Sequence, residues 1–292
     1  MAEPLLLVDL PWLLYRSYFA LPSSLKDARG RPTGALLGAI GALLTLTADG
    51  KETIAVRAIA LCTGAEQAGY RVELYRPYHA HRPPMPDALA EQWRRAPELM
   101  SAFGWSVHDS VDLEADDVIF SLAREEAGHG GISLILSADR DLYGAVDGAT
   151  GVLELKRGGS APAVIDAAGV RERVGVDPAQ VPDLIALRGD PSDGLPGARG
   201  IGAKTAAQLL AAHGSLDGVV AAARAGALRP RQAAAVLDDE AQLRDFLHVA
   251  TLQRTAVERP ADAATDFAAG ARAARDAGMA RLAQRAARLA TA

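Results

Sequence analysis

The feature that most limits the fold of this 292-residue chain is the alternation of short apolar runs with longer helix-period segments. Three runs are apolar and too short for a stable helix: residues 5–8, 53–61 and 132–136. Three segments carry apolar residues at the spacing of a helix face: residues 35–46, 88–103 and 115–127. Strands that alternate with helices are typical of a parallel sheet flanked by helices, so we predict an α/β fold.

The second half of the chain differs from the first. Beyond Asp177 no convincing strand appears, and short helices punctuated by Gly and Pro make up the remainder. We therefore predict a sheet domain over residues 1–180 and a helical domain over residues 181–292. Residues 271–289 are rich in Ala and Arg and predict one helix with a solvated basic face.

Acidic side chains stand where the predicted strands end and a helix begins. Asp9 follows the first run and Asp139 follows the third, and ligands of open parallel sheets bind beyond the carboxyl ends of the strands. The other acids of the set open the third helical segment or follow Asp139 closely: Glu114, Asp116, Asp117 and Asp141. A single acid at a helix start is usually a cap. Together these acids predict one cluster in a common crevice.

Such a cluster limits the chemistry of the site. Crowded carboxylates repel one another unless cations neutralise them, and hard oxygen ligands select Mg²⁺ or Mn²⁺. Two such ions about 4 Å apart can activate a water and stabilise the leaving oxygen of a phosphodiester. The cluster therefore predicts a metal-dependent nuclease.

An irregular segment follows the second apolar run. Residues 76–86 contain four prolines among basic side chains, which excludes one regular helix. A surface loop is the simplest interpretation, but its place beside the predicted site favours a substrate-handling arch over about residues 66–100.

Aromatic side chains in two places could stack on unpaired bases. Tyr15, Tyr18 and Phe19 follow the first run, although packing in the core is an equal alternative for Phe19. The second group alternates with arginines, as expected of a wall that grips a single-stranded 5′ end: Tyr70, Arg71, Tyr75, Arg76, Tyr78 and Arg82.

A glycine-rich segment, residues 196–205, leads into a helical run of the second predicted domain. It fails as a phosphate-binding P-loop, because Ala203 separates Gly202 from Lys204 and no strand precedes it. The arrangement of Gly200, Gly202, Lys204 and Thr205 instead resembles the hairpin of a helix-hairpin-helix or helix-two-turn-helix element. Its glycines let the backbone approach a DNA phosphate, so we expect DNA binding without sequence preference.

These stretches resemble the 5′ nuclease family that includes the N-terminal domain of bacterial DNA polymerase I, stand-alone bacterial 5′→3′ exonucleases and the flap endonucleases. The resemblance runs to about Val220, and the stretches that carry it are residues 6–9 (LLVD), 71–75 (RVELY), 78–86 (YHAHRPPMP), 114–117 (EADD), 137–142 (SADRDL) and 189–197 (GDPSDGLPG).

The resemblance implies a PIN-like fold with two sites for Mg²⁺ or Mn²⁺ and a substrate of DNA with a 5′ flap or a 5′ end at a duplex junction. It assigns to the tighter metal site Asp9, Glu114, Asp116 and Asp139. It assigns to the looser site Asp141, Asp190 and Asp193, with Asp117 nearby. Among these acids it implies catalytic roles for Asp9, Asp116, Asp139 and Asp141, joined by Arg71. DNA contacts are implied for Tyr15, Arg71, Tyr78, His79 and Arg82, and K⁺ in the hairpin.

The sequence departs from the family pattern at three places. The family aspartate after the second strand is missing, since Thr63 or Gly64 falls there, and Glu66 is the acid that lies close in sequence. His79 replaces a lysine and Gly194 an asparagine. A second hypothesis is therefore a flap-binding protein with a degraded nuclease centre. A third, an RNA-directed PIN-type ribonuclease, fits the DNA hairpin less well.

Charge and composition are compatible with this function. The net charge of -5 argues at first sight against a nucleic-acid partner, but setting aside the eight acids of the metal sites leaves +3. The single cysteine, Cys62, excludes an internal disulfide, and no apolar run reaches the roughly 18 residues of a membrane helix. We expect a monomer in the cytoplasm.

Overall fold

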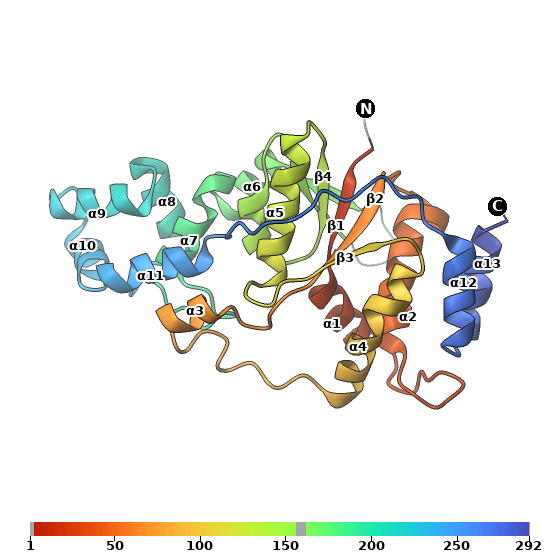
Figure 1. Ribbon diagram of the computed structural model, residues 1–292. Coiled ribbons are helices and arrows are strands. Elements are labelled where there is room, and N and C mark those ends of the chain that lie inside the picture. The colour runs from red at the N-terminus through yellow and green to blue at the C-terminus, as the bar shows by residue number, and fades with distance from the viewer. Residues whose placement is uncertain (1–2, 156–161, 292) are drawn as a thin grey trace.

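A six-stranded sheet forms the centre of the computed structural model, which describes residues 3–155 and 162–291 (Figure 1). The strand order is β3-β2-β1-β4-β5-β6, and all neighbours are parallel except β5 and β6. The strands are β1 (Leu5–Asp9), β2 (Ala58–Cys62), β3 (Ser106–His108), β4 (Ser133–Leu136), β5 (Thr150–Glu154) and β6 (Ala163–Ile165). The predicted α/β fold is confirmed.

Three of these strands are additional to the predicted ones. The two edge strands, β3 and β6, have three residues each, which is too short to display a two-residue period. β5 carries Gly151 between polar Thr150 and apolar Val152, so its apolar stretch is only two residues long. β2 starts at Ala58 rather than at residue 53.

Both faces of β1 are buried, and its alternate side chains enter two apolar cores. Leu5 and Leu7 lie in the core that contains α5 (Ala115–Gly128). Leu6 and Val8 lie in the core formed with α1 (Leu10–Ala20), α2 (Gly34–Leu44) and α4 (Asp87–Ser101). Burial on both sides explains the uninterrupted apolar run in the sequence.

The chain from residue 167 to residue 250 is helical and extends to one side of the sheet (Figure 1). Its helices are α6 (Ala167–Val174), α7 (Val181–Arg188), α8 (Ala203–His213), α9 (Leu216–Arg224), α10 (Pro230–Leu237) and α11 (Glu240–Ala250). Helix α11 packs on α7 and on the short α3 (Gly69–Leu74). The predicted helical domain is confirmed. None of the helices in the described ranges is long and apolar enough to cross a bilayer.

After α11 the chain returns to the sheet domain as an extended strap, residues 251–266, that runs along α5 (Figure 1). The N–H of Gln253 donates to Asp117 Oδ1 (2.7 Å), and the N–H of Thr255 donates to Ser121 Oγ (2.9 Å). Farther on, the Arg259 guanidinium bonds to the buried carboxylate of Glu126. The strap therefore joins the helical domain to α5 along most of the length of that helix.

Two helices complete the core beside α2 and α4: α12 (Phe267–Asp276) and α13 (Ala280–Leu289). The prediction of one helix over residues 271–289 is wrong, because Gly278 adopts a left-handed conformation (φ 76°) and turns the chain. Four arginines of these helices are exposed, as predicted: Arg272, Arg275, Arg281 and Arg288. Arg285 instead pairs with Asp49. Residues 267–289 thus pack with the sheet domain, while the boundary near residue 181 stays a prediction.

Candidate active site

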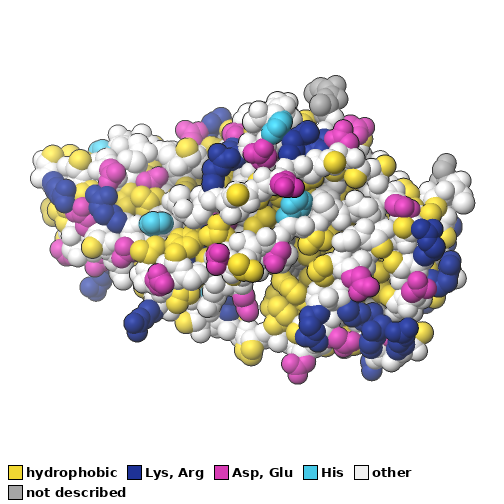
Figure 2. Space-filling model, in the orientation of Figure 1, with side chains coloured by type: hydrophobic (Ala, Val, Ile, Leu, Met, Phe, Trp, Pro, Cys, Tyr) yellow, Lys and Arg dark blue, Asp and Glu magenta, His cyan; other side chains and the backbone are white. Residues whose placement is uncertain are grey.

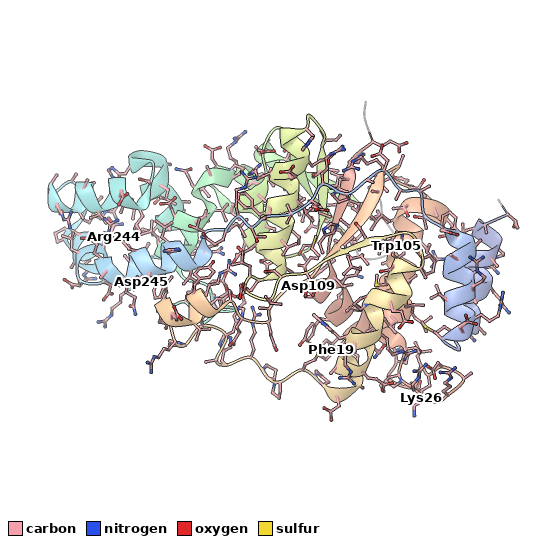
Figure 3. The ribbon with its side chains drawn as sticks, in the orientation of Figure 1. Phe19, Lys26, Trp105, Asp109, Arg244 and Asp245 are labelled. Atoms are coloured by element: carbon pink, nitrogen blue, oxygen red, sulfur yellow. The ribbon has the colours of Figure 1, made fainter. Side chains whose placement is uncertain are left out.

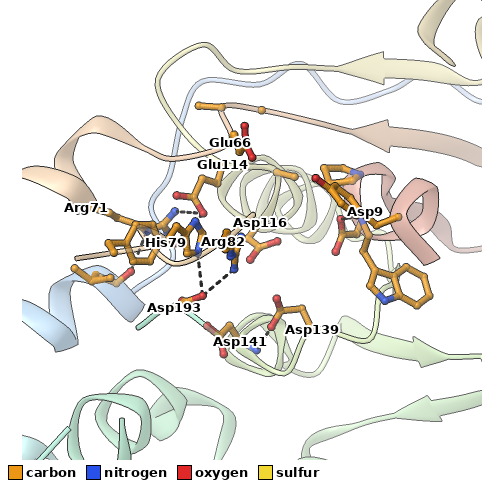
Figure 4. A pocket seen from close by; sticks show the side chains of 18 of the residues that line it. Asp9, Glu66, Arg71, His79, Arg82, Glu114, Asp116, Asp139, Asp141 and Asp193 are labelled. Atoms are coloured by element: carbon orange, nitrogen blue, oxygen red, sulfur yellow. Dashed lines mark hydrogen bonds and ion pairs between the residues drawn. The ribbon is translucent and has the colours of Figure 1, made fainter. Parts of the chain in front are cut away.

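Acidic side chains line one pocket at the carboxyl end of the sheet (Figure 4). The pocket has a volume of ≈ 520 Å³ and lies among β1, the start of α5 and the segment after β4. Its acids are Asp9, Glu66, Glu114, Asp116, Asp139, Asp141 and Asp193. The structure thus brings six of the eight predicted carboxylates to one pocket and leaves Asp117 and Asp190 outside its lining.

Asp9 ends β1 and caps α1. Its Oδ1 accepts a hydrogen bond from the N–H of Trp12 (3.0 Å), and its Oδ2 accepts one from the Ser137 hydroxyl (2.6 Å). Ser137 Oγ also accepts from the N–H of Asp139 (3.0 Å). One buried hydroxyl therefore orients two acids. Sequence reasoning assigned no role to Ser137, although its place directly after an apolar strand and two residues before an acid was a usable signal.

Ionisation of these acids is unfavourable without a counter-charge. Desolvation raises the pKa of Asp9 to about 6, and the charge of Asp139 adds to the effect. Desolvation, followed by the charges of Asp139, Asp9 and Glu114, raises the pKa of Asp116 well above its usual value. The pKa of Asp141 rises for the same two kinds of reason. A bound cation would reverse these shifts, because it favours the charged form of each acid.

The acids at the centre of the pocket accept few hydrogen bonds. The carboxylates of Asp116 and Asp141 accept none from the described residues, and Asp139 accepts one, from the N–H of Asp141 (3.0 Å). Within residues 3–155 and 162–291, no three acidic, His or Cys side chains are close enough to hold an ion as they stand. The donor set nevertheless fits a hard cation, because it consists of carboxylate oxygens whose lone pairs are free on these three residues.

Glu114 occupies another side of the pocket and is fully engaged. Its Oε1 accepts from the N–H of Ala68 (2.8 Å), and its Oε2 accepts from the Tyr78 hydroxyl (2.9 Å) and lies 3.1 Å from Arg71 Nη1. The Arg71 guanidinium is buried, and its Nε donates to the carbonyl of Val249 in α11 (2.9 Å). This arginine therefore joins the base of the arch to α11 and to the start of α5.

Asp117 was expected near the metal site, but the structure places it behind the pocket. Its side chain is completely buried and accepts from Arg71 Nη2 (2.9 Å) and from the N–H of Gln253 (2.7 Å). Asp117 also forms a capping box with Glu114 at the start of α5. These contacts occupy the carboxylate, so Asp117 anchors the strap. The Arg71 guanidinium is also bound by protein groups, because it pairs with Glu114 and Asp117 and donates to the carbonyl of Val249.

The two acids of the 189–197 stretch are placed differently. Asp193 lines the pocket and accepts from His79 Nε2 (2.9 Å) and Arg82 Nη2 (3.0 Å), as Figure 4 shows. Asp190 lies outside the lining and accepts from the N–H of Ser192 (2.8 Å) and from its hydroxyl. The loop is thus tied to the arch through Asp193 and closed on itself through Asp190.

The position at which the resemblance implies a family aspartate has little room for a side chain. A Cβ on Gly64 would lie 2.4 Å from the carbonyl oxygen of Leu113 and 2.9 Å from the nitrogen of Ala115. A side chain at this position would therefore collide with the backbone that leads into α5. Thr63 is buried and lies outside the pocket lining, whereas Glu66 reaches the lining on the side away from Asp139 and Asp141 (Figure 4).

Comparison with known proteins identifies the family. Residues 4–175 match the family model described as 5′-3′ exonuclease, N-terminal resolvase-like domain. Residues 176–269 match the model described as 5′-3′ exonuclease, C-terminal SAM fold. The chain belongs to the 5′-3′ exonuclease family.

Individual relatives support this membership. The 5′-3′ exonuclease of Mycobacterium tuberculosis is 37% identical over 243 residues, which cover 76% of this chain and 74% of that protein. The 5′-3′ exonuclease of Streptomyces coelicolor is 38% identical over 231 residues, which cover 74% of each. DNA polymerase I of Deinococcus radiodurans is 37% identical over 228 residues, which cover 78% of this chain and 23% of the polymerase.

Solved structures of low identity share the fold of this chain. The T5 D15 protein co-crystallized with metal ions has a TM-score of 0.67 and 16% identity, with 99% of this chain and 100% of that chain covered. The catalytic core of Rad2 in complex with DNA substrate has a TM-score of 0.63 and 15% identity, with 100% and 92% covered. The predicted combination of a PIN-like sheet domain and a helical domain is thereby confirmed.

The predicted DNA-binding hairpin lies at the start of α8. Gly200 has a φ of 76°, a conformation that favours glycine, and Gly202 precedes the first residue of the helix. Lys204 is exposed and Thr205 is partly exposed, while Ile201 is buried and fixes the turn. The unpaired N–H groups of the first helical turn and the lysine are suited to a phosphate group.

The tyrosines of the arch are packed against protein rather than free. Tyr78 is buried and donates its hydroxyl to Glu114, Tyr75 contacts Phe246 edge-on (5.0 Å between ring centroids), and Tyr70 lies beside His248. These contacts hold the three rings against protein groups, although Tyr78 also lines the pocket and Tyr70 and Tyr75 stay partly exposed, so the wall that grips a single strand stays a prediction. Tyr15 and the exposed Arg82 line the same pocket.

Proposed function

We propose that this member of the 5′-3′ exonuclease family is a structure-specific nuclease that hydrolyses DNA at a 5′ flap or at a 5′ end beside a duplex. The observation that carries the proposal is the pocket in which Asp116, Asp139 and Asp141 keep carboxylate oxygens free of protein donors. Acids that are desolvated and unpaired in this way need cations, and their place in a nuclease fold connects them with phosphodiester cleavage.

Asp116, Asp139 and Asp141 would hold Mg²⁺ or Mn²⁺, together with Asp9, whose orientation is set by Ser137. When bound, such ions supply an activated water and stabilise charge on the leaving oxygen. Glu114 contributes through its fixed position at the start of α5 rather than through free lone pairs. Asp193 is paired with His79 and Arg82, so we infer that these pairs must open before it can serve a looser metal site.

The helical domain would bind the duplex next to the cleavage site. We infer that the first turn of α8, with Lys204, receives a phosphate of the duplex backbone, and that K⁺ can take part in this contact through carbonyls of the hairpin. The arch above the pocket would then direct the single-stranded 5′ segment toward the acids. Cleavage would leave 5′-phosphate and 3′-hydroxyl ends. We further propose that the protein acts as a monomer in the cytoplasm.

The test is cleavage of a 5′-labelled DNA flap by the purified protein with Mg²⁺ and, separately, with Mn²⁺. We expect cutting near the junction by the wild type and a loss of cutting by Asp141→Ala. If both proteins leave the flap uncut in both metals, the proposal fails. Tight flap binding without cutting would instead support a DNA-binding protein with a degraded centre, and preference for an RNA flap would support a ribonuclease.

A further inference from the structure

The pocket has a second wall, which is aromatic rather than acidic. Trp12 and Tyr15 from α1, Met85 from the arch and Trp93 from α4 line it. The rings of Tyr15 and Trp93 meet edge-on, with centroids 6.2 Å apart and an interplanar angle of 75°. Two segments distant in sequence therefore build one aromatic surface inside the pocket.

This surface continues toward solvent along α1. Trp12, Tyr15 and Phe19 are spaced so that they share one side of the helix. Phe19 stacks on Tyr15 with centroids 6.4 Å apart and an angle of 26°, yet 72% of its surface is exposed. Figure 2 shows hydrophobic side chains beside the hollow in this region of the molecule.

Trp12, Tyr15 and Trp93 pack against the second apolar core on one side, but this packing does not cover them completely. Phe103 and Trp105 show what core aromatics look like in this protein, since they stack at 4.8 Å and expose 0% and 2% of their surfaces. Trp12, Tyr15 and Trp93 remain partly exposed, although Tyr15 and Trp93 contact each other. Figure 3 places Trp105 beside the start of β3, well away from Phe19. An aromatic surface left open inside a pocket is available to a flat ligand.

The charges around the wall favour a ligand that carries phosphates. Arg16 lies over the Trp12 ring at 5.7 Å, and Arg82 lines the pocket with 42% of its side chain exposed. One acid, Glu66, also faces Tyr15, where its charge raises the pKa of the phenol after desolvation. Aromatic rings among arginines are typical of surfaces on which the bases of a single strand stack while cations follow its backbone.

We propose that Trp93 and Tyr15 form a stacking platform for unpaired nucleobases of the 5′ single strand as it passes to the acidic cluster. This inference deepens the proposed function and rests on it. Base pairs within a continuous duplex have both faces covered by their neighbours, so the platform cannot stack on them, whereas unpaired bases of the 5′ segment are available to it. It would therefore contribute to the choice of a single-stranded 5′ segment over continuous duplex.

The test compares flaps with normal nucleotides against flaps whose unpaired nucleotides next to the junction are abasic. For the wild type, removal of the bases should raise KM about 10-fold, the size expected for one stacked base, with little change in kcat. Trp93→Leu should show the same rise on the normal flap and no further rise on the abasic flap. Trp93→Phe, which keeps a ring, should behave like the wild type.

Binding in EDTA tests the platform independently of cleavage. Titration with oligothymidylate should quench tryptophan fluorescence of the wild type and of Trp105→Phe, and Trp93→Leu should lose most of the quenching and bind about 10-fold more weakly. Equal binding by Trp93→Leu and the wild type, or equal sensitivity of both to abasic flaps, overturns the platform. A wild type that binds the oligonucleotide but cuts no flap overturns the proposed nuclease function and leaves the platform supported.

Discussion

The two sides of the acidic pocket are built on opposite principles. On one side, Glu114 and the neighbouring Asp117 are neutralised by Arg71 and bonded to the arch and the strap. On the other, Asp116 and Asp141 accept no hydrogen bond from the described protein groups, and their pKa values are raised well above the usual range. The difference teaches that neighbouring acids of one cluster can have different roles. Some stabilise the tertiary structure through ion pairs and hydrogen bonds, and others are available to bind a cation. Substitutions should therefore affect stability on the first side and catalysis on the second.

The largest expected effect is that of Asp116→Asn on catalysis. If this variant cleaves DNA normally, the proposed metal-binding role of Asp116 is wrong. A bound cation is worth several kcal/mol in the transition state, so flap cleavage should fall roughly 1,000-fold or more. In EDTA the same variant should be more stable than the wild type, because an acid with a raised pKa has been removed. Initial rates and urea unfolding measure the two effects. Asp112→Asn, which changes an exposed acid outside the pocket, is the matched control.

The opposite pattern is expected on the other side of the pocket for Arg71→Met. The change leaves the carboxylates of Glu114 and Asp117 without their shared cation, and Asp117 is completely buried. Loss of one partner from a buried pair should lower the free energy of unfolding by at least about 3 kcal/mol. Arg76→Met, at an exposed position of the arch, provides the baseline in the same denaturant series. An unchanged midpoint would remove Arg71 from its anchoring role.

The pH dependence of stability sharpens the comparison. Asp9 titrates at about 6 in the folded protein and near 3.8 when unfolded, so its contribution is present below pH 3.8 and is lost as the pH rises through 6. For metal-free protein this amounts to up to about 3 kcal/mol. The difference in free energy of unfolding between the wild type and Asp9→Asn, measured by denaturation from pH 3.5 to 7, gives the contribution of Asp9. Millimolar Mg²⁺ should abolish the loss, and a pH-independent difference would contradict the assignment.

The smallest effect concerns Gly64, the position at which the resemblance implies a family aspartate. Gly64→Ala places a Cβ against the backbone at Leu113, and we expect a loss of about 1–3 kcal/mol in thermal or chemical unfolding. Gly69→Ala is the matched control, because no atom lies within 4 Å of its added Cβ. If Gly64→Ala is as stable as the control, the strand end has room for a side chain, and the hypothesis of a lost metal ligand regains support.

Local signals were sufficient to predict the acidic side of the sheet. An apolar run with an acid at its end or within three residues of it marks both a buried strand and its carboxyl end, as at Asp9 and Asp139. Strands β3 and β6 lacked such a signal, because three residues at the edge of a sheet need no apolar pattern. Their place became visible only through pairing with β2 and β5.

The division of roles between Asp116 and Asp117 could not be predicted. Successive helical residues point about 100° apart, so the two neighbours face different surroundings. Asp117 meets Gln253, 136 positions later, and that partner belongs to a strap whose course depends on the whole tertiary structure. The anchoring role of Arg71 could not be predicted for the same reason, because its contact with Val249 joins residues 178 positions apart.

The return of α12 and α13 to the sheet domain has a consequence for biosynthesis. Gly270 approaches so close to Phe103 that an added Cβ would lie within 2.3 Å of the ring, so α12 closes this core directly. At roughly 5–20 residues per second, these helices leave the ribosome roughly 10–40 s after α4. The domain begun first is therefore completed last. During translation, the apolar faces of α2 and α4 that α12 and α13 will cover remain exposed to solvent, although all residues of the helical domain have already been synthesised.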